Sequence, residues 1–137
     1  MGHFEMNGID DIMRQLEGIA NATDETAMKM IDTAAPILEK NLRKNVEAAA
    51  NRGYATGQLA AAVTAGKAKM NEFGCYSIVT AEGKDKKGVR NMEKLAYLEY
   101  GTPGGQVAHP VMKKSINESE NDCLRVMQQV FERETGL

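Results

Sequence analysis

The spacing of apolar residues in the first third of the chain predicts two amphipathic helices. Between Gly8 and Ala20, five apolar side chains share one helical stripe: Ile9, Ile12, Met13, Leu16 and Ile19. A longer helix is predicted from Glu25 to about Asn51, because apolar residues recur every three or four positions, at Met28, Ile31, Ala35, Leu38, Leu42 and Ala49. Such a narrow apolar seam requires another helix to pack against it.

Polar residues and a proline modify the prediction for this long helix. Asn45 is the one polar residue on the apolar seam. Pro36 cannot donate a backbone hydrogen bond, so we expect a kink there, or two helices that meet near Ala34–Ala35. The opposite face is expected to be solvated, because it carries charged residues at Lys40, Arg43, Lys44 and Glu47.

In the middle of the chain, the spacing of apolar residues changes from the helical period toward the two-residue period of a strand. Gly57–Gly66 fits two short helical turns, and Lys67–Ala81 alternates partly by two, which predicts a hairpin that turns around Asn71–Gly74. Residues 82–91 are rich in lysine between glycines and are predicted to form an exposed, mobile loop. For Met92–Tyr100, periodicity does not distinguish a short helix from a strand, and both remain open.

The C-terminal third predicts a loop and a last helix. Residues 102–110 are expected to form an exposed loop, followed by a helix from about Val111 to Arg133. One face of this helix is apolar, with Met112, Ile116, Cys123, Met127, Val130 and Phe131. The order of elements lacks βαβ alternation, so it predicts an α+β fold: N-terminal helices including one long kinked helix, a small antiparallel sheet and a C-terminal amphipathic helix.

Length and composition are typical of one domain with an adaptable core. The 137 residues form a single domain, 1–137, of which 1–7 are expected to be disordered. The chain has nine Met, three Phe and no Trp, so we expect a thinly filled core whose stability depends on partner subunits. There is no signal-peptide pattern and no apolar run approaching the roughly 20 residues that cross a bilayer, which predicts no membrane partner.

Charge and cysteine content narrow the function further. The formal net charge of −2 gives no overall basic field for nucleic acid. Cys75 and Cys123 lack CxxC spacing, so we expect two free thiols in a reducing cytoplasm.

The loop sequence GTPGGQ, at Gly101–Gln106, raises the question of a phosphate or metal site. A phosphate-binding loop needs a Lys and a Ser or Thr at fixed offsets, which are missing here, and Pro103 removes one N–H donor. Zinc requires four clustered ligands, whereas the only histidines are His3 and His109. We therefore predict no metal and no cofactor.

The residues that could carry catalysis also lack the partners that catalysis requires. A Cys75–His109 nucleophile pair lacks the helix start or nearby cation that would lower the pKa of the thiol. The carboxylates of Glu82, Glu93 and Glu99 have no evident partner for acid–base work. We predict no catalytic residue and no enzymatic activity.

A short basic run is the one candidate for contact with DNA. Lys84, Lys86, Lys87 and Arg90 could face phosphates, although Asp85 interrupts the run and no aromatic residue is interleaved for base stacking. A solvated loop is the simpler interpretation. In a ring-shaped assembly, however, such a loop could face a DNA-filled channel.

Two segments about 40 residues apart resemble motifs of one phage family. YATGQLAAAV, at Tyr54–Val63, resembles a "TG-x-L-x-x-S-I" segment, and LAYLEYGTPGGQVAHPVM, at Leu95–Met112, resembles a "Y-A-x-x-x-E-[FY]-G-T … [RH]-P-[FV]" segment. The family is the tail-component, or tail-completion (neck), proteins of long-tailed phages and prophages, of the HK-ninety-seven gene-ten type. With the long helix before the first motif and the amphipathic helix after the second, the resemblance spans nearly the whole chain.

The chain departs from the family pattern at two places. Ala62 stands where the family commonly has Ser, and His109-Pro110-Val111 stands where Arg-Pro-Phe is typical. Because the Arg and Phe that usually anchor the last helix are missing, we expect Val111 and Met112 to fill that place less completely.

The resemblance implies a non-enzymatic structural protein of the virion tail or neck, synthesised in the bacterial host cytoplasm. Such a protein joins or completes the tail at the head–tail interface through ring-forming contacts. Its partners would be copies of itself and other neck, connector or tail proteins. The matching positions, which are the candidate motif and interface residues, are Thr56, Gly57, Leu59, Tyr97, Glu99, Tyr100, Gly101, Thr102 and Pro110.

For the second motif we expect a strand end and turn over Tyr97–Thr102, which fix the loop before the last helix. Gly101 would supply backbone freedom, and Glu99 would accept hydrogen bonds from backbone amides or from Thr56. The tyrosines fit simple core or interface filling equally well. The alternative function is a small DNA-binding or regulatory protein that uses the Lys84–Arg90 loop, against which the acidic pI of about 5.7 argues.

Overall fold

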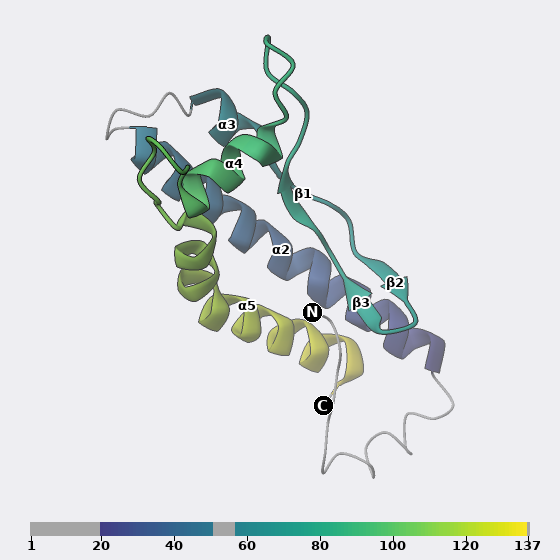
Figure 1. Cartoon of the computed structure of the whole chain (residues 1–137). Helices are drawn as coiled ribbons and strands as arrows, with labels where there is room; N and C mark the ends of the chain where they lie inside the picture. Colours follow the sequence, from purple (N-terminus) through teal and green to yellow (C-terminus); the bar gives the residue numbers. More distant parts are fainter. Residues whose placement is uncertain (1–19, 51–56, 137) are drawn as a thin grey trace.

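The structure is a computed structural model that describes residues 20–50 and 57–136 (Figure 1). Its elements in chain order are α2 (Ala20–Ala50), α3 (Gly57–Ala62), β1 (Val63–Ala65), β2 (Lys69–Asn71), β3 (Gly74–Tyr76), β4 (Val79–Ala81), α4 (Asn91–Tyr100) and α5 (Val111–Thr135). This order of helices around a small antiparallel sheet confirms the predicted α+β fold. The helix predicted over Gly8–Ala20 lies outside the described residues except for Ala20, as does the segment 1–7.

The long helix α2 continues through its proline. It runs from Ala20 to Ala50 with Pro36 inside it, so the prediction of two helices that meet near Ala34–Ala35 is wrong. Pro36 is exposed, so its ring is accommodated on the solvent side of the helix. One missing N–H does not end a helix whose two halves are both held by packing against other elements.

Helices α2 and α5 pack side by side in opposite directions. Lys29 near the start of α2 pairs with Glu134 near the end of α5, at 3.1 Å. At the other end, Lys44 pairs with Glu118 at 3.0 Å, and hydrogen bonds from Lys44 and Asn45 hold the pKa of Glu118 below its ordinary value. These polar contacts fix the register of the two helices.

The buried face of α5 holds two serines beside the predicted apolar residues. Of the predicted apolar face, Ile116 is 56% exposed and the other five residues are at least partly buried, while Ser115 and Ser119 are fully buried. The amides of Asn45 and Asn41 on α2 donate to these two serines, each at 2.8 Å. A buried amide needs a hydrogen-bond partner, and serine supplies one while letting the helices approach closely, so α5 turns its serines inward.

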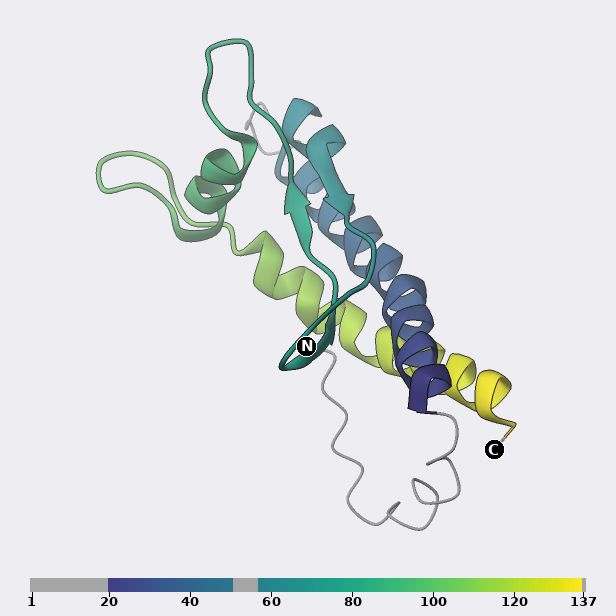
Figure 2. The same cartoon turned by 90° about the vertical axis from the view of Figure 1, so that its right-hand side faces the viewer.

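The four strands form two two-stranded antiparallel sheets, which follow one another along a single long hairpin that we call the ribbon. β1 pairs with β4, and β2 pairs with β3 through the predicted turn at Asn71–Gly74, which confirms the hairpin. Between the two ladders, Gly66 N–H donates to the Ile78 carbonyl at 2.9 Å. In Figures 1 and 2 the ribbon lies along one side of α2.

Side chains of α2 satisfy the outer edge of the first strand. Arg43 donates to the carbonyls of Ala60 and Val63, and Glu39 accepts from the Ala65 N–H. Between β1 and β2, the Ala68 N–H donates to Asp32 of α2 at 2.6 Å. Arg43 is therefore not on a purely solvated face as predicted, whereas Lys40, Lys44 and Glu47 are exposed. A two-stranded ribbon is only marginally stable alone, and these bonds hold it on the helix.

The core lies at the C-terminal half of α2. It joins apolar side chains from six elements, namely Leu42, Val46, Ala49, Leu59, Ala60, Val63, Ala81, Leu95, Leu98 and Val111. Figure 2 shows the two loops that flank α4 projecting from this end of the molecule. Of the helices within residues 20–50 and 57–136, none has the length and apolar character needed to cross a membrane.

Candidate functional site

The second motif covers the end of α4, the loop that follows it and the start of α5, where the chain makes a corner between the two helices. Met92–Tyr100 is helical, so the helix-or-strand question is settled in favour of helix and the predicted strand end is wrong. Leu95, Leu98 and Glu99 are buried, at the three- and four-residue spacing of one helical face. Tyr97, which precedes Leu98 in the sequence, lies on an exposed face of the helix.

Gly101 ends α4 in a conformation that other residues rarely adopt. Its φ is 75° and its ψ 180°, and its N–H donates to the Tyr97 carbonyl at 2.8 Å. A Cβ at this position would lie 2.7 Å from the Gln106 carbonyl oxygen and 3.0 Å from the Ala108 nitrogen. Both the backbone angles and the lack of space thus require glycine, which confirms the predicted need for backbone freedom.

Glu99 of α4 caps the N-terminus of α5, although it lies more than ten residues earlier in the sequence. Its buried carboxylate accepts hydrogen bonds from the backbone N–H groups of Met112, at 2.6 Å, and Lys113, at 3.2 Å. These amides belong to the first turn of α5, which has no side-chain cap at Pro110. A carboxylate at a helix N-terminus is stabilised by both the orphan N–H groups and the helix dipole. Acceptance from backbone amides is therefore confirmed, whereas the alternative donor, Thr56, lies outside the described residues.

The loop between the two helices is closed by its own backbone. Thr102 N–H donates to the Gln106 carbonyl at 3.0 Å, and Gln106 N–H returns to the Thr102 hydroxyl at 2.9 Å. His109 N–H donates to the Leu98 carbonyl at 2.7 Å. Pro110, with φ −74° and ψ 70°, makes an inverse γ-turn in which Val111 N–H donates to the His109 carbonyl. The chain thus enters α5 at a defined angle.

The two motifs meet in the core. Leu59 of the first motif, on α3, belongs to the same buried cluster as Leu95 and Leu98 of the second. Val111 is buried in this cluster and Met112 packs against it, so both residues help to hold the start of α5 on the core. Gly57 begins α3, and Thr56 lies outside the described residues.

Several large side chains around the corner face solvent instead of the core. Tyr100 is 77% exposed and Val107 is 70% exposed, with Tyr97 and Met92 less so. Tyr97 donates its hydroxyl proton to Glu93, and this hydrogen bond raises the pKa of Tyr97. The tyrosines are therefore not core residues. We use the name corner patch for the exposed large side chains of α4 and the loop that follows it, namely Met92, Tyr97, Tyr100 and Val107.

The basic loop is held in one conformation by the acidic residue that interrupts it. Asp85 accepts from the N–H groups of Lys87, at 2.8 Å, and Val89, at 2.9 Å. It also pairs with Lys94 of α4, and the hydrogen bond from Lys94 holds the pKa of Asp85 below its ordinary value. Sequence reasoning treated Asp85 as an interruption. The signal of its role is the Asp-x-x-Gly turn pattern that ends at Gly88.

The outward-facing side chains of this loop are Lys84, Lys86, Lys87 and Arg90, and all four are exposed. None of the four makes an ion pair with another described residue. The loop therefore presents four cations to solvent, while the charge of Asp85 is balanced by Lys94.

The candidate nucleophiles are separated in the fold. Cys75 lies in β3 opposite Met70 of β2, whereas His109 lies at the entrance to α5. Burial raises the pKa of both the Cys75 and the Cys123 thiols, which disfavours the reactive thiolate. His109 and Lys114 line a pocket of about 140 Å³ with Asn45 and Pro110, and no cysteine borders it. In the described part of the chain, no three His, Cys, Asp or Glu side chains cluster closely enough to hold a metal ion.

Comparison of this chain with protein-family models, curated proteins and solved structures finds no significant match in any of the three. The resemblance to phage tail-component proteins therefore rests on the two sequence motifs alone.

Proposed function

We propose that the protein is a non-enzymatic structural component of a phage or prophage virion, which joins or completes the tail at the neck through ring-forming contacts. The observation that carries this proposal is the meeting of the two motif segments. Although they lie about 40 residues apart in the sequence, Leu59 and the pair Leu95 and Leu98 share one buried cluster. Residues that match one family pattern thus act as one structural unit.

The form of the second motif adds support. Gly101 and Glu99 set the path of the chain into α5 through a turn at positive φ and a helix cap supplied from α4. This rigid corner carries the exposed tyrosines of the corner patch. Aromatic residues are enriched at protein interfaces, and a patch used by a different surface on the next copy generates rings.

The proposal is tested by assembly. The wild-type chain, a Tyr100→Ser variant and a matched Asn117→Ser control, which alters an exposed residue of α5, are analysed by size-exclusion chromatography with light scattering. Each is run alone and with tail-tube and connector proteins from the same genome. We expect the wild type and the control to enter a larger complex and Tyr100→Ser to enter it much less, with all three melting at similar temperatures.

Two results would count against the proposal. One is the absence of any complex with neck or tail proteins for the wild-type chain. The other is a genome neighbourhood without portal, capsid or tail-tube genes. Equal assembly by Tyr100→Ser would leave the virion role standing and would remove the corner patch as its interface.

The exposed basic loop favours contact with DNA as a second candidate function. The loop carries four exposed cations, its Asp85 is paired with Lys94, and one further exposed acid, Glu82, stands at its start, so the loop forms a small basic site at one end of the molecule. Neutralisation of Lys84, Lys86 and Lys87 to Gln should weaken DNA retention in low-salt filter binding and reduce its dependence on salt. No retention by the wild-type chain would exclude this role.

A further inference from the structure

The two edges of the ribbon differ in what they contact. Along the edge formed by β1 and the residues after it, Arg43, Glu39 and Asp32 of α2 bind backbone groups. The opposite edge is formed by residues 74–81, which comprise β3, β4 and the two residues between them, and which we call the edge strand. Figure 2 shows β1 lying between β4 and α2. These side chains of α2 therefore satisfy one edge of the ribbon only.

The register shows which backbone groups of the edge strand point outward. In an antiparallel ladder, successive residues direct their N–H and C=O groups alternately toward the partner strand and away from it. The Ile78 carbonyl accepts from the Gly66 N–H and therefore points inward. The residues on either side, Ser77 and Val79, point outward, as does Cys75 by the same alternation. In the part of the chain that the structure describes, no hydrogen bond beyond the two ladders reaches the backbone of these three residues.

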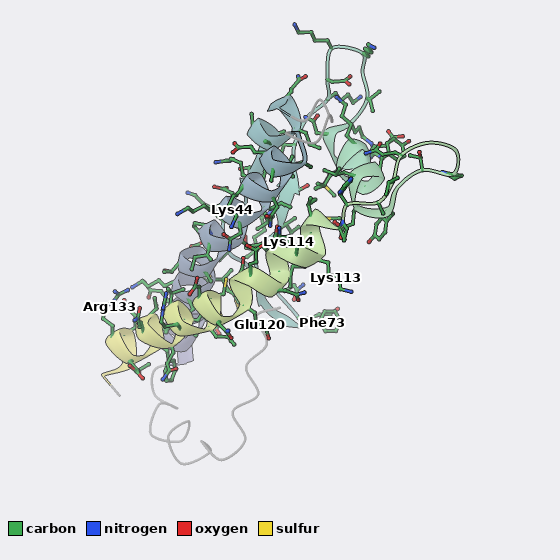
Figure 3. All side chains as sticks on the ribbon, turned by 90° about the vertical axis from the view of Figure 1, so that its left-hand side faces the viewer. Lys44, Phe73, Lys113, Lys114, Glu120 and Arg133 are labelled. Atoms are coloured by element: carbon green, nitrogen blue, oxygen red, sulfur yellow. The ribbon has the colours of Figure 1, made fainter. Side chains whose placement is uncertain are left out.

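The two ends of the edge strand differ. Beside α4, the Ala81 N–H donates to the Met92 sulfur at 3.3 Å, which occupies the last outward donor. At the other end, Phe73 in the hairpin turn is 74% exposed, and in Figure 3 it lies on the side of α5 opposite Lys44. Among the described residues, the free groups of this edge are therefore the backbone of 75–79 that points outward and the Ala81 carbonyl.

The edge strand lacks the features that usually protect an edge. Natural edge strands carry charged residues or proline, or lie under another element. Residues 74–81 have the sequence GCYSIVTA, which contains no charged residue and no proline. Tyr76, Ile78 and Thr80 share one face of the ribbon, on which Ile78 is 56% exposed. Aromatic and β-branched residues of this kind favour pairing with another strand.

A second copy of the chain fits this edge. When two edge strands pair antiparallel about Ile78, outward residues meet outward residues. Ser77 then lies opposite Val79 of the second copy, and the two residues exchange both of their backbone hydrogen bonds. Cys75 lies opposite Ala81 of the second copy, whose free carbonyl accepts from the Cys75 N–H. The edge is thus complementary to itself.

The side chains agree with this register. Ile78 meets Ile78 of the second copy at the twofold axis, which removes from water an apolar side chain that is half exposed. Tyr76 of one copy lies beside Thr80 of the other, a cross-strand pair of an aromatic and a β-branched residue. At the two ends, the exposed Glu72 of one copy approaches the exposed Lys84 of the other, so the charges are complementary.

We propose that two copies of the chain associate through their edge strands, antiparallel and centred on Ile78, to form a continuous four-stranded sheet. This contact joins identical surfaces across a twofold axis, so it differs from the heterologous contact that closes a ring. The inference does not depend on the proposed virion function. One strand from each copy makes a contact smaller than that of a permanent dimer, so the pair should dissociate on dilution.

Hydrogen exchange of the full-length wild-type chain, measured residue by residue by NMR, tests the pairing. As the protein is concentrated, the amides of Ser77 and Val79 should exchange roughly tenfold more slowly. The Thr80 amide is an internal control, because it points toward Thr64 in the β1–β4 ladder and should not depend on concentration. Light scattering should show the molar mass rising from the 15.0 kDa of one chain toward twice that value over the same range.

Two matched variants identify the surface. Ile78 and Ile116 are equally exposed isoleucines, one on the edge strand and the other on α5. Ile78→Lys brings two like charges together at the twofold axis and should keep the chain monomeric at concentrations where the wild type is dimeric. Ile116→Lys adds the same charge on α5 and should dimerise as the wild type does. Both altered side chains are exposed, so both variants should melt at the wild-type temperature.

Three results would overturn the proposal. A wild-type chain that stays monomeric at every concentration has no such pairing. Protection of Ser77 and Val79 that does not change with concentration shows that another part of the same chain covers the edge. Dimerisation of Ile78→Lys as strong as that of the wild type places the contact on a different surface. The exchange measurement uses the wild-type chain, so it decides the question even if a variant fails to fold.

Discussion

Replacement of Gly101 by alanine should cost more stability than alanine at any other glycine of the described loops. Two penalties add at this position. A non-glycine residue at φ 75° and ψ 180° costs about 1–3 kcal/mol. The new Cβ would also lie 2.7 Å from the Gln106 oxygen and 3.0 Å from the Ala108 nitrogen, both backbone atoms that cannot rotate away. Overpacking of this kind costs about 1–3 kcal/mol more.

Two other glycines separate the two penalties. Gly88 has φ 83° but no atom within 4 Å of a built Cβ, so Gly88→Ala should cost only the backbone term of about 1–2 kcal/mol. Gly104 has neither a positive φ nor a neighbour within 4 Å. Gly104→Ala should therefore leave stability unchanged or raise it by up to about 1 kcal/mol, because alanine restricts the unfolded chain.

Thermal and urea unfolding, followed by far-UV circular dichroism, measure the series. A total cost of about 4 kcal/mol for Gly101→Ala corresponds to a fall in melting temperature of roughly 14 °C for a chain of 137 residues. We expect the order of stability Gly104→Ala, then Gly88→Ala, then Gly101→Ala. If Gly101→Ala unfolds together with Gly88→Ala, the close approach to Gln106 costs nothing. If it unfolds together with Gly104→Ala, the reasoning about both penalties is wrong.

Three further predictions concern polar contacts. Glu99→Gln should destabilise the protein by about 1–2 kcal/mol and speed amide exchange in the first turn of α5, because the charged acceptor is lost; unchanged exchange there would contradict the capping role. The pKa of Asp85 is lowered in the folded state, so its contribution to stability is present above its unfolded pKa and is lost as pH falls through the folded value. Lys94→Met should raise the pKa of Asp85 toward its ordinary value in an NMR titration, and an unmoved titration would show that Lys94 is not the cause. A double-mutant cycle of Asn45→Ala and Ser115→Ala should give a coupling of about 1 kcal/mol, and strictly additive effects would mean that their hydrogen bond contributes nothing.

Features that depend on neighbours along the chain were predictable. The two long helices follow from apolar spacing, the hairpin from the alternation on either side of Asn71–Gly74, and Gly101 from its place at the end of a motif. Local pattern was insufficient for Met92–Tyr100, because so short a segment fits both the helical and the strand period. Only the burial of Leu95 and Leu98 in the core shows which face is packed.

Features that depend on a distant partner were missed. The rotation of α5 that buries Ser115 instead of Ile116 follows from an amide on α2, 70 residues earlier in the chain. From the pattern of its own helix, Arg43 is predicted to be solvated. The carbonyls that it binds, at Ala60 and Val63, come from α3 and β1, which follow later in the chain. For the candidate site, the motif residues were identified from sequence, but the exposure of the tyrosines and the anchoring by Asp85 were not.

The sequence by itself determined the order of the elements, the kind of each except Met92–Tyr100, and the residues of the second motif, because helical period, turn residues and glycine requirements act over a few positions. Only the tertiary structure decided which face of each helix is buried, how Glu99 caps α5 and which apolar residues remain exposed. Those outcomes depend on satisfying buried polar groups with partners far along the chain, and no local pattern records where such partners meet.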